Sequence, residues 1–213
     1  GVILADTPGG AVVVASMGTS TVRFQFVDFF RNGQLGRTRG GAICSHSQGT
    51  GPSNPAVQSG TLQVTSCRLT SNFGGAVDLV LIQETTRQVV AFSASNVEYN
   101  TASRNGGGVA IRATNAAVSI SESCEFKFNV AQQGAGGGLY LRLQGNVALT
   151  IADSFFESNT AISGGGIFTD SLCKVAGQCP GETVKVTNTK FTGHVASAGA
   201  AVVVNSASSH VFS

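Results

Sequence analysis

Pairs of apolar residues separated by one position recur along the chain, each five to eight residues before a further apolar residue. Six of these pairs are Val22/Phe24, Leu62/Val64, Val90/Phe92, Val118/Ile120, Leu149/Ile151 and Val184/Val186. A second set follows clusters of glycine, at Val109/Ile111, Leu139/Leu141 and Val202/Val204. Alternation with a period of two predicts β-strands, and no stretch carries an apolar face at helical spacing. We therefore expect an all-β chain.

These strands belong to a repeat in which an apolar anchor is followed three positions later by Asn, and then by glycines and an aliphatic residue. The six copies are Phe29/Asn32, Leu69/Asn72, Val97/Asn100, Phe126/Asn129, Phe156/Asn159 and the degraded pair Phe191/His194. Successive Asn residues lie 40, 28, 29 and 30 positions apart, and His194 follows after 35. Strands and turns repeated every 28 to 30 residues predict a single-stranded parallel β-helix, a solenoid with turns about 4.8 Å apart. The coil is expected to be right-handed, as parallel crossovers nearly always are.

Each repeat position has an expected physical role. The anchors should stack in a column through the core, so that neighbouring turns bury what one turn alone could not. Asn tolerates a left-handed backbone at a tight bend, and its side chains are expected to pair along the axis. The glycines allow positive φ and a close approach of neighbouring backbones. The small residue two positions after Asn should fit the same crowded corner, at Ala102, Ala131, Ala161 and Ala196.

The combination of Phe-x-x-Asn with Gly-Gly-Ala-Ile resembles the repeat of the polymorphic outer-membrane-protein family of bacterial surface adhesins. The best matches are residues 156–159 and residues 40–43, and the resemblance covers nearly the whole chain. It implies a right-handed β-helix at a cell surface, with a role in adhesion or assembly. The repeat itself is scaffold, so the resemblance bears more on the fold than on the function.

The chain starts in mid-pattern, because Gly9-Gly-Ala-Val12 lacks a preceding Phe-x-x-Asn. We expect residues 1–213 to form a single segment of about seven turns, part of a longer chain or a unit that stacks end to end with other copies. Residues 44–60 and 169–182 are expected to be inserted surface loops, because they are rich in polar residues, Gly and Pro. Insertions on solenoids commonly gather on one face, often the binding face.

The chain has five cysteines. Cys173 and Cys179 lie six residues apart in the second insertion, and we expect them to form a local disulfide. Cys67 and Cys124 each precede an anchor by two positions, which would place them two turns apart and too far for a bond. Cys44 is expected to be free or bonded to a partner.

Composition favours an extracellular or cell-surface location, because charged residues make up only 11% of the chain. The net charge is +2 and no basic run is present, so nucleic acid is not an expected partner. No apolar run has the length of a membrane span. No motif for a cofactor or metal ion is present, and no cofactor is expected.

A catalytic alternative rests on carboxylates, because related β-helices degrade polysaccharides and glycosidases need two carboxyl groups close together. The nearest candidate cluster is Glu98, Glu122, Glu125, Asp153 and Glu157, which Lys127 and Arg104 could neutralise. The acidic residues are otherwise scattered, so we do not expect an enzyme.

Three functional hypotheses follow. The first is a non-catalytic structural or adhesive scaffold of an extracellular assembly such as an appendage, filament or wall. The second is a carbohydrate-binding or polysaccharide-degrading β-helix, and the third is a bacterial-type surface adhesin passenger. The expected partners are flanking turns of the same chain, other copies end to end, or a surface or glycan ligand.

Overall fold

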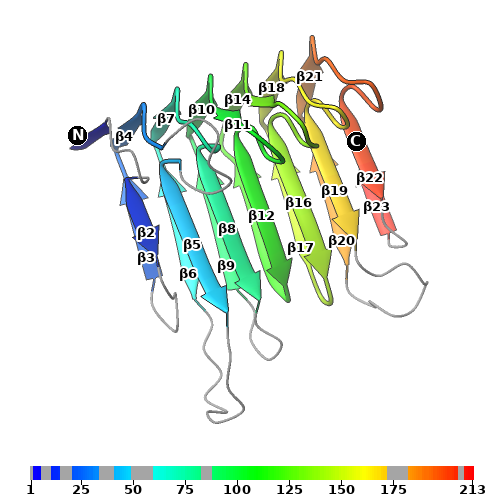
Figure 1. Cartoon of the computed structure of the whole chain (residues 1–213). Helices are drawn as coiled ribbons and strands as arrows, with labels where there is room; N and C mark the ends of the chain where they lie inside the picture. Colours follow the sequence, from blue (N-terminus) through cyan, green and yellow to red (C-terminus); the bar gives the residue numbers. More distant parts are fainter. Residues whose placement is uncertain are drawn as a thin grey trace.

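A computed structural model describes residues 2–5, 11–14, 21–33, 41–48, 60–82, 88–171, 182–205 and 209–213. These residues contain no helix and form three seven-stranded sheets, through which the chain winds as a coil (Figure 1). Every strand pairing is parallel, and each strand pairs with the strand of the same sheet in the next turn. The predicted parallel β-helix is therefore confirmed, while the handedness of the coil stays a prediction.

Each turn contributes one strand to each sheet. Sheet A contains β1 (Val2–Ala5), β4 (Val27–Phe30), β7 (Arg68–Thr70), β10 (Asn96–Glu98), β14 (Glu125–Lys127), β18 (Phe155–Glu157) and β21 (Lys190–Thr192). Sheet B contains β2 (Val12–Val14), β5 (Ile43–Gln48), β8 (Val77–Ile82), β12 (Val109–Thr114), β16 (Leu139–Gln144), β19 (Ile167–Ser171) and β22 (Val202–Asn205). Sheet C contains β3 (Thr21–Gln25), β6 (Thr61–Thr65), β9 (Gln88–Ser93), β13 (Ala116–Ser121), β17 (Ala148–Ala152), β20 (Thr183–Thr187) and β23 (Ser209–Phe212). A further short pair, β11 (Thr101–Ala102) and β15 (Val130–Ala131), follows sheet A in two turns.

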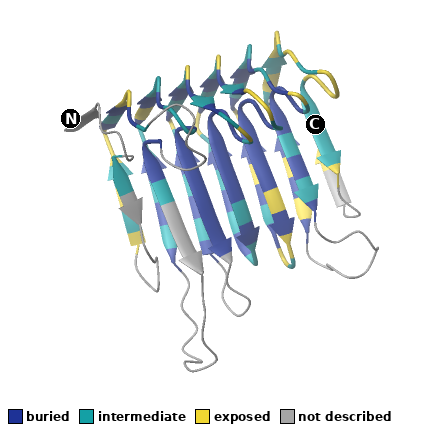
Figure 2. Cartoon of the chain, viewed as in Figure 1, coloured by how far each residue is buried: buried dark blue, intermediate teal, exposed yellow. Residues whose placement is uncertain are grey.

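The anchors of the repeat lie in one column along sheet A, because the strand register pairs each anchor with the next. The rings of Phe126 and Phe156 stack with centroids 4.7 Å apart, and Phe156 stacks on Phe191 at 5.2 Å. The anchors from Phe29 to Phe156 are fully buried, whereas Phe191 in the last turn is partly buried. Figure 2 shows the same trend, with mostly buried long strands in the middle turns and a less buried β22. A shared apolar core thus runs along the axis.

The bend after sheet A is made one residue earlier than the sequence predicted. Positive φ angles occur at the residue before each Asn or His of the repeat, namely Arg31, Ser71, Tyr99, Phe128, Ser158 and Gly193. The expectation that Asn itself takes the left-handed conformation is wrong. The chain has already turned when it reaches Asn, and the Asn side chain points to its equivalent in the next turn.

Glycine is required where two turns approach closely before sheet B. A Cβ atom added at Gly137 would lie 2.5 Å from the carbonyl oxygen of Gly165 and 2.6 Å from that of Thr160. Gly107, one turn earlier, would meet the backbone of Gly137 and Val130 in the same way. Both positions need the absence of a side chain rather than a positive φ.

The predicted insertions overlap the sheets at their edges. Strand β5 continues through Gln48, so the first residues of the insertion predicted at 44–60 are part of sheet B. Likewise β19 continues through Ser171, within the insertion predicted at 169–182. Strand pairing therefore extends further than the composition suggested, and residues 49–59 and 172–181 lie outside the described residues.

Candidate functional site

A ladder of asparagine side chains runs along the corner that follows sheet A. In each step Oδ1 of one Asn accepts hydrogen bonds from both the backbone N–H and the Nδ2 amide of the preceding Asn. These distances are 2.9 to 3.1 Å over Asn32, Asn72, Asn100, Asn129 and Asn159. From Asn72 onward Nδ2 also donates to the carbonyl oxygen of an earlier anchor, at 2.8 to 3.2 Å. All five side chains are fully buried, so the ladder satisfies polar groups that water cannot reach.

His194 takes the next position of this ladder. Its Nδ1 accepts a hydrogen bond of 3.1 Å from the backbone N–H of Asn159, while its Nε2 is buried without a hydrogen-bond partner. Burial lowers the pKa of His194 below its ordinary value of 6.5. An imidazole that accepts a hydrogen bond at Nδ1 is neutral, so His194 replaces the Asn acceptor at this position of the ladder.

A second column of small side chains lies at the corner between sheets C and A. Ser95, Ser154 and Thr189 each donate a hydrogen bond to the carbonyl oxygen two residues earlier, and the Cys67 thiol does the same at 3.3 Å. Burial raises the pKa of the Cys67 thiol and raises that of Cys124 to about 11. Neither thiol forms a disulfide, and thiols with such pKa values are poor nucleophiles at neutral pH. Cys67 and Cys124 thus occupy a structural column, whereas Cys173 and Cys179, the predicted disulfide, lie outside the described residues.

The acidic cluster predicted from the sequence is divided between two places. Glu98, Glu125 and Glu157 belong to strands of sheet A, whereas Glu122 and Asp153 take left-handed conformations at the corner before that sheet. Glu98, Lys127 and Glu157 are direct neighbours on β10, β14 and β18.

Lys127 interacts with three carboxylates on this part of sheet A. Its Nζ lies 2.7 Å from Oε2 of Glu125, and this hydrogen bond is the main reason why the pKa of Lys127 is raised. The charges of Glu98 and Glu157 act in the same direction. Lys127 is therefore a charged ammonium group at neutral pH, and Arg104 belongs to the turn that follows β11.

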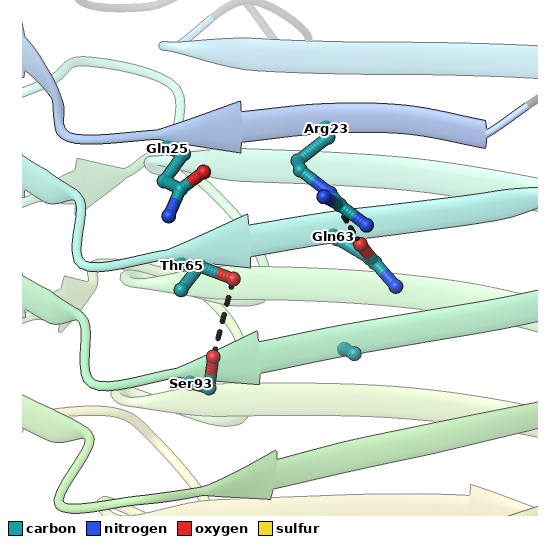
Figure 3. Close-up of a pocket in the computed structure, with 6 residues that line it drawn as sticks. Arg23, Gln25, Gln63, Thr65 and Ser93 are labelled. Carbon is teal, nitrogen blue, oxygen red and sulfur yellow. Dashed lines mark hydrogen bonds between the residues drawn. The ribbon is translucent and has the colours of Figure 1, made fainter.

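A shallow pocket lies on the outer face of sheet C near the N-terminal turns (Figure 3). Its volume is about 250 Å³. Arg23, Gln25, Gln63, Thr65, Ala91 and Ser93 line it. Nε of Arg23 donates to Oε1 of Gln63 at 2.7 Å, and the hydroxyl groups of Ser93 and Thr65 are 3.2 Å apart. The lining offers hydrogen bonds and one cation but no carboxylate, so it can hold a small polar group without acid–base chemistry.

Two exposed aromatic rings stack at the corner that follows sheet A. The rings of Tyr99 and Phe128 lie 4.9 Å apart and nearly parallel, at 9°. Tyr99 is 54% exposed and Phe128 is 39% exposed. This pair was not predicted from the sequence, although both residues directly precede the repeat asparagines Asn100 and Asn129. The sequence does show an aromatic residue directly before the Asn in two successive repeats, and this recurrence could have predicted the stack.

Comparison of the chain with family models, curated proteins and solved structures finds no match. Within the described part of the chain, no helix is long and apolar enough to cross a membrane. The same residues contain no group of three or more His, Cys, Asp or Glu side chains that could hold a metal ion.

Proposed function

We propose that this chain is a non-catalytic structural and adhesive scaffold of an extracellular or cell-surface assembly. The observation that carries the proposal is the unbroken Asn ladder, which joins five successive turns by the same set of buried hydrogen bonds. The repeated residues and their contacts join each turn to the next along the axis, as expected of a rod that bears load. The resemblance of the repeat to that of the polymorphic outer-membrane-protein adhesins supports the same role.

The state of the reactive side chains also suits a scaffold. The thiols of Cys67 and Cys124 are buried with raised pKa values, and Lys127 is held by Glu125. A low content of charged residues and a surface supplied by Ser, Thr, Asn and Gly favour an extracellular location. The rod presents side chains at fixed heights along its axis, a suitable geometry for display or adhesion.

The terminal turns are the proposed contact points with flanking turns or other copies. Strands β21, β22 and β23 each have a described neighbour on one side only, and the same holds for β1, β2 and β3. Open strand edges pair readily with further strands. We propose parallel, end-to-end continuation of the three sheets through these edges.

Electron microscopy of the purified chain, with two matched variants, tests this proposal. We expect rods that join end to end in the wild type and in Val203→Lys, whose new side chain faces outward beside Phe168. Val204→Lys should yield single rods, because position 204 pairs with the fully buried Thr169 and would place a charge inward at the open edge. Single rods of the wild type, unchanged in Val204→Lys, would contradict end-to-end contact. Release of sugars from polysaccharides by the wild type would contradict a non-catalytic role.

A further inference from the structure

Tyr99 and Phe128 form an aromatic ridge that the fold does not require. Both residues have left-handed backbones, with φ of 56° and 54°, which bulky side chains rarely adopt. Both also expose large apolar rings to solvent. An exposed apolar ring gains little from folding, so neither side chain contributes to the stability of the coil as the buried anchors do.

The equivalent positions in neighbouring turns show which residues are sufficient to form this corner. The backbone hydrogen bonds of the corner continue from Ser71 through Tyr99 and Phe128 to Ser158. Ser71 and Ser158 adopt the same left-handed conformation, with φ of 58° and 51°, and Gly193 follows with φ of 66°. The corner therefore forms with small residues, and the two aromatic side chains are additions to it.

The two rings stack on each other, and the corner positions on either side of the stack along the coil are occupied by serine. Tyr99 faces Phe128 on one side, and the position on its other side is taken by Ser71. Phe128 in turn has Ser158 on its free side. Serine is much smaller than an aromatic residue, and both rings keep a large exposed surface, with Tyr99 54% and Phe128 39% exposed.

The surface beside the ridge is polar and electrically balanced. Among the described residues, sheet A and the corner after it carry four acidic residues, Asp28, Glu98, Glu125 and Glu157, and four basic residues, Arg31, Arg68, Lys127 and Lys190. Glu98 directly precedes Tyr99, and Lys127 directly precedes Phe128. Lys127 and Lys190 lie over the ring of Phe155, 5.2 and 5.5 Å from its centroid. The exposed rings thus lie next to hydrogen-bond donors and acceptors, on a surface whose described acidic and basic residues are equal in number.

We propose that the aromatic ridge binds the pyranose rings of a neutral glycan. The C–H face of a sugar ring packs on an exposed aromatic face, while its hydroxyl groups donate to carboxylates and accept from ammonium groups. The balance of four acidic and four basic residues favours a neutral ligand over a polyanion, which needs an excess of positive charge. The ridge is also small and flanked by serines, unlike the broad apolar centre of a stable protein interface. This inference rests on the proposed adhesive function and names its ligand class.

Tyrosine fluorescence gives a direct readout. The chain has no Trp and two Tyr. Tyr140 is buried against Phe168, so a Tyr140→Phe variant leaves the ridge residue as the reporter. We would titrate this variant of the full chain with neutral hexasaccharides of glucose, mannose, xylose and N-acetylglucosamine, and with a hexasaccharide of galacturonic acid. At least one neutral probe should bind and change the emission, and the acidic probe should bind more weakly.

Two further variants separate the ridge from exposed aromatic surface in general. Tyr99→Ser with Phe128→Ser copies Ser71 and Ser158 and should weaken glycan binding, measured by calorimetry, by at least about tenfold. Phe26→Ser is the matched control, because Phe26 is 61% exposed with φ of 54° at the other corner of sheet A, and it should leave binding unchanged.

The inference is overturned if no neutral probe binds, if only the acidic probe binds, or if the double variant binds as the wild type does. It is equally overturned if the ridge retains a protein from extracellular material and no sugar. Electron microscopy of the double variant keeps the two proposals apart, because loss of sugar binding with intact rods concerns the ridge alone.

Discussion

The Nδ2 amide of Asn129 donates a hydrogen bond of 2.9 Å to Oδ1 of Asn159, one turn further along the coil. The same amide donates to the carbonyl oxygen of Val97 at 2.8 Å, one turn back. One buried side chain therefore ties together three successive turns. The stability of the coil should depend on such contacts more than on any feature within a single turn.

Asn129→Ala should lower the free energy of unfolding by about 2–4 kcal/mol, because each buried polar group left without a partner costs about 1–3 kcal/mol. The variant would deprive the backbone N–H of Asn100 of its acceptor, and the side-chain amide of Asn100 of one of its two acceptors. Chemical denaturation followed by circular dichroism measures the loss. Asn96→Ala, on the outward face of β10, is the control and should change stability by less than about 0.5 kcal/mol. Equal losses of unfolding free energy in the two variants would contradict a specific contribution of the ladder to stability.

Phe156→Ala should destabilise the protein by about 3–5 kcal/mol, since it removes a fully buried ring from the centre of the core. The rings of Phe126 and Phe191 both stack on the ring of Phe156, so its removal would also leave a cavity between them. Phe155→Ala removes the adjacent, outward-facing ring and should cost much less, which thermal unfolding can verify. A larger loss of stability for Phe155→Ala than for Phe156→Ala would mean that the core lies on the opposite face of sheet A.

Gly137→Ala should destabilise the coil by about 1–3 kcal/mol or more, because overpacking forces the backbone to shift. The new methyl group would meet backbone atoms of Gly165 and Thr160, which cannot move aside independently. Gly193→Ser is a milder comparison, because its added Cβ would meet the Ser158 hydroxyl at 3.0 Å and serine already occurs at this corner. Denaturant midpoints that rank the two variants in the opposite order would contradict the close approach at Gly137.

His194 should make the last turns sensitive to acid. Because burial lowers the pKa of His194, the unfolded chain binds a proton more readily than the folded chain does. The contribution of the neutral imidazole is fully present above the ordinary value of 6.5 and is lost as the pH falls below it. Protonation would also remove the acceptor for the N–H of Asn159.

His194→Asn extends the ladder with a group that does not titrate, and it isolates this effect. Unfolding at pH 7.5 and pH 5 should show a larger loss of stability in the wild type than in the variant. Both proteins share the same carboxylates, so those groups cancel in the comparison. An identical pH dependence of the two proteins would assign the acid sensitivity elsewhere.

The sequence predicted the coil because its main determinants recur in phase. The anchors, from Phe29 to Phe191, repeat at the turn period, and their column follows once the strands are placed parallel. Asn pairing was likewise predictable, because a buried amide needs a partner and the nearest one lies in the next turn. Periodic burial and hydrogen bonding are properties that spacing alone reveals.

Other features depend on backbone detail that spacing does not reveal. The left-handed residue at the corner is the one before Asn, and Arg31, Ser71 and Tyr99 share that conformation without sharing any chemical property. The exposed stack of Tyr99 and Phe128 was missed for the same reason, because the repeat was defined by its anchors and glycines. Edges of insertions were misplaced where polar residues such as Ser45 and Gln48 continue a strand.

The stacking of turns is tested most directly by distances between spin labels along sheet C. Labels carried on encoded amino acids would be placed at position 23 and, in separate proteins, at positions 119, 150 and 185, which the strand register puts in one outward column. Pulsed electron resonance should give distances of roughly 14, 19 and 24 Å, rising by about 4.8 Å with each turn. Distances that do not increase steadily from one turn to the next would contradict the coil, and with it the scaffold.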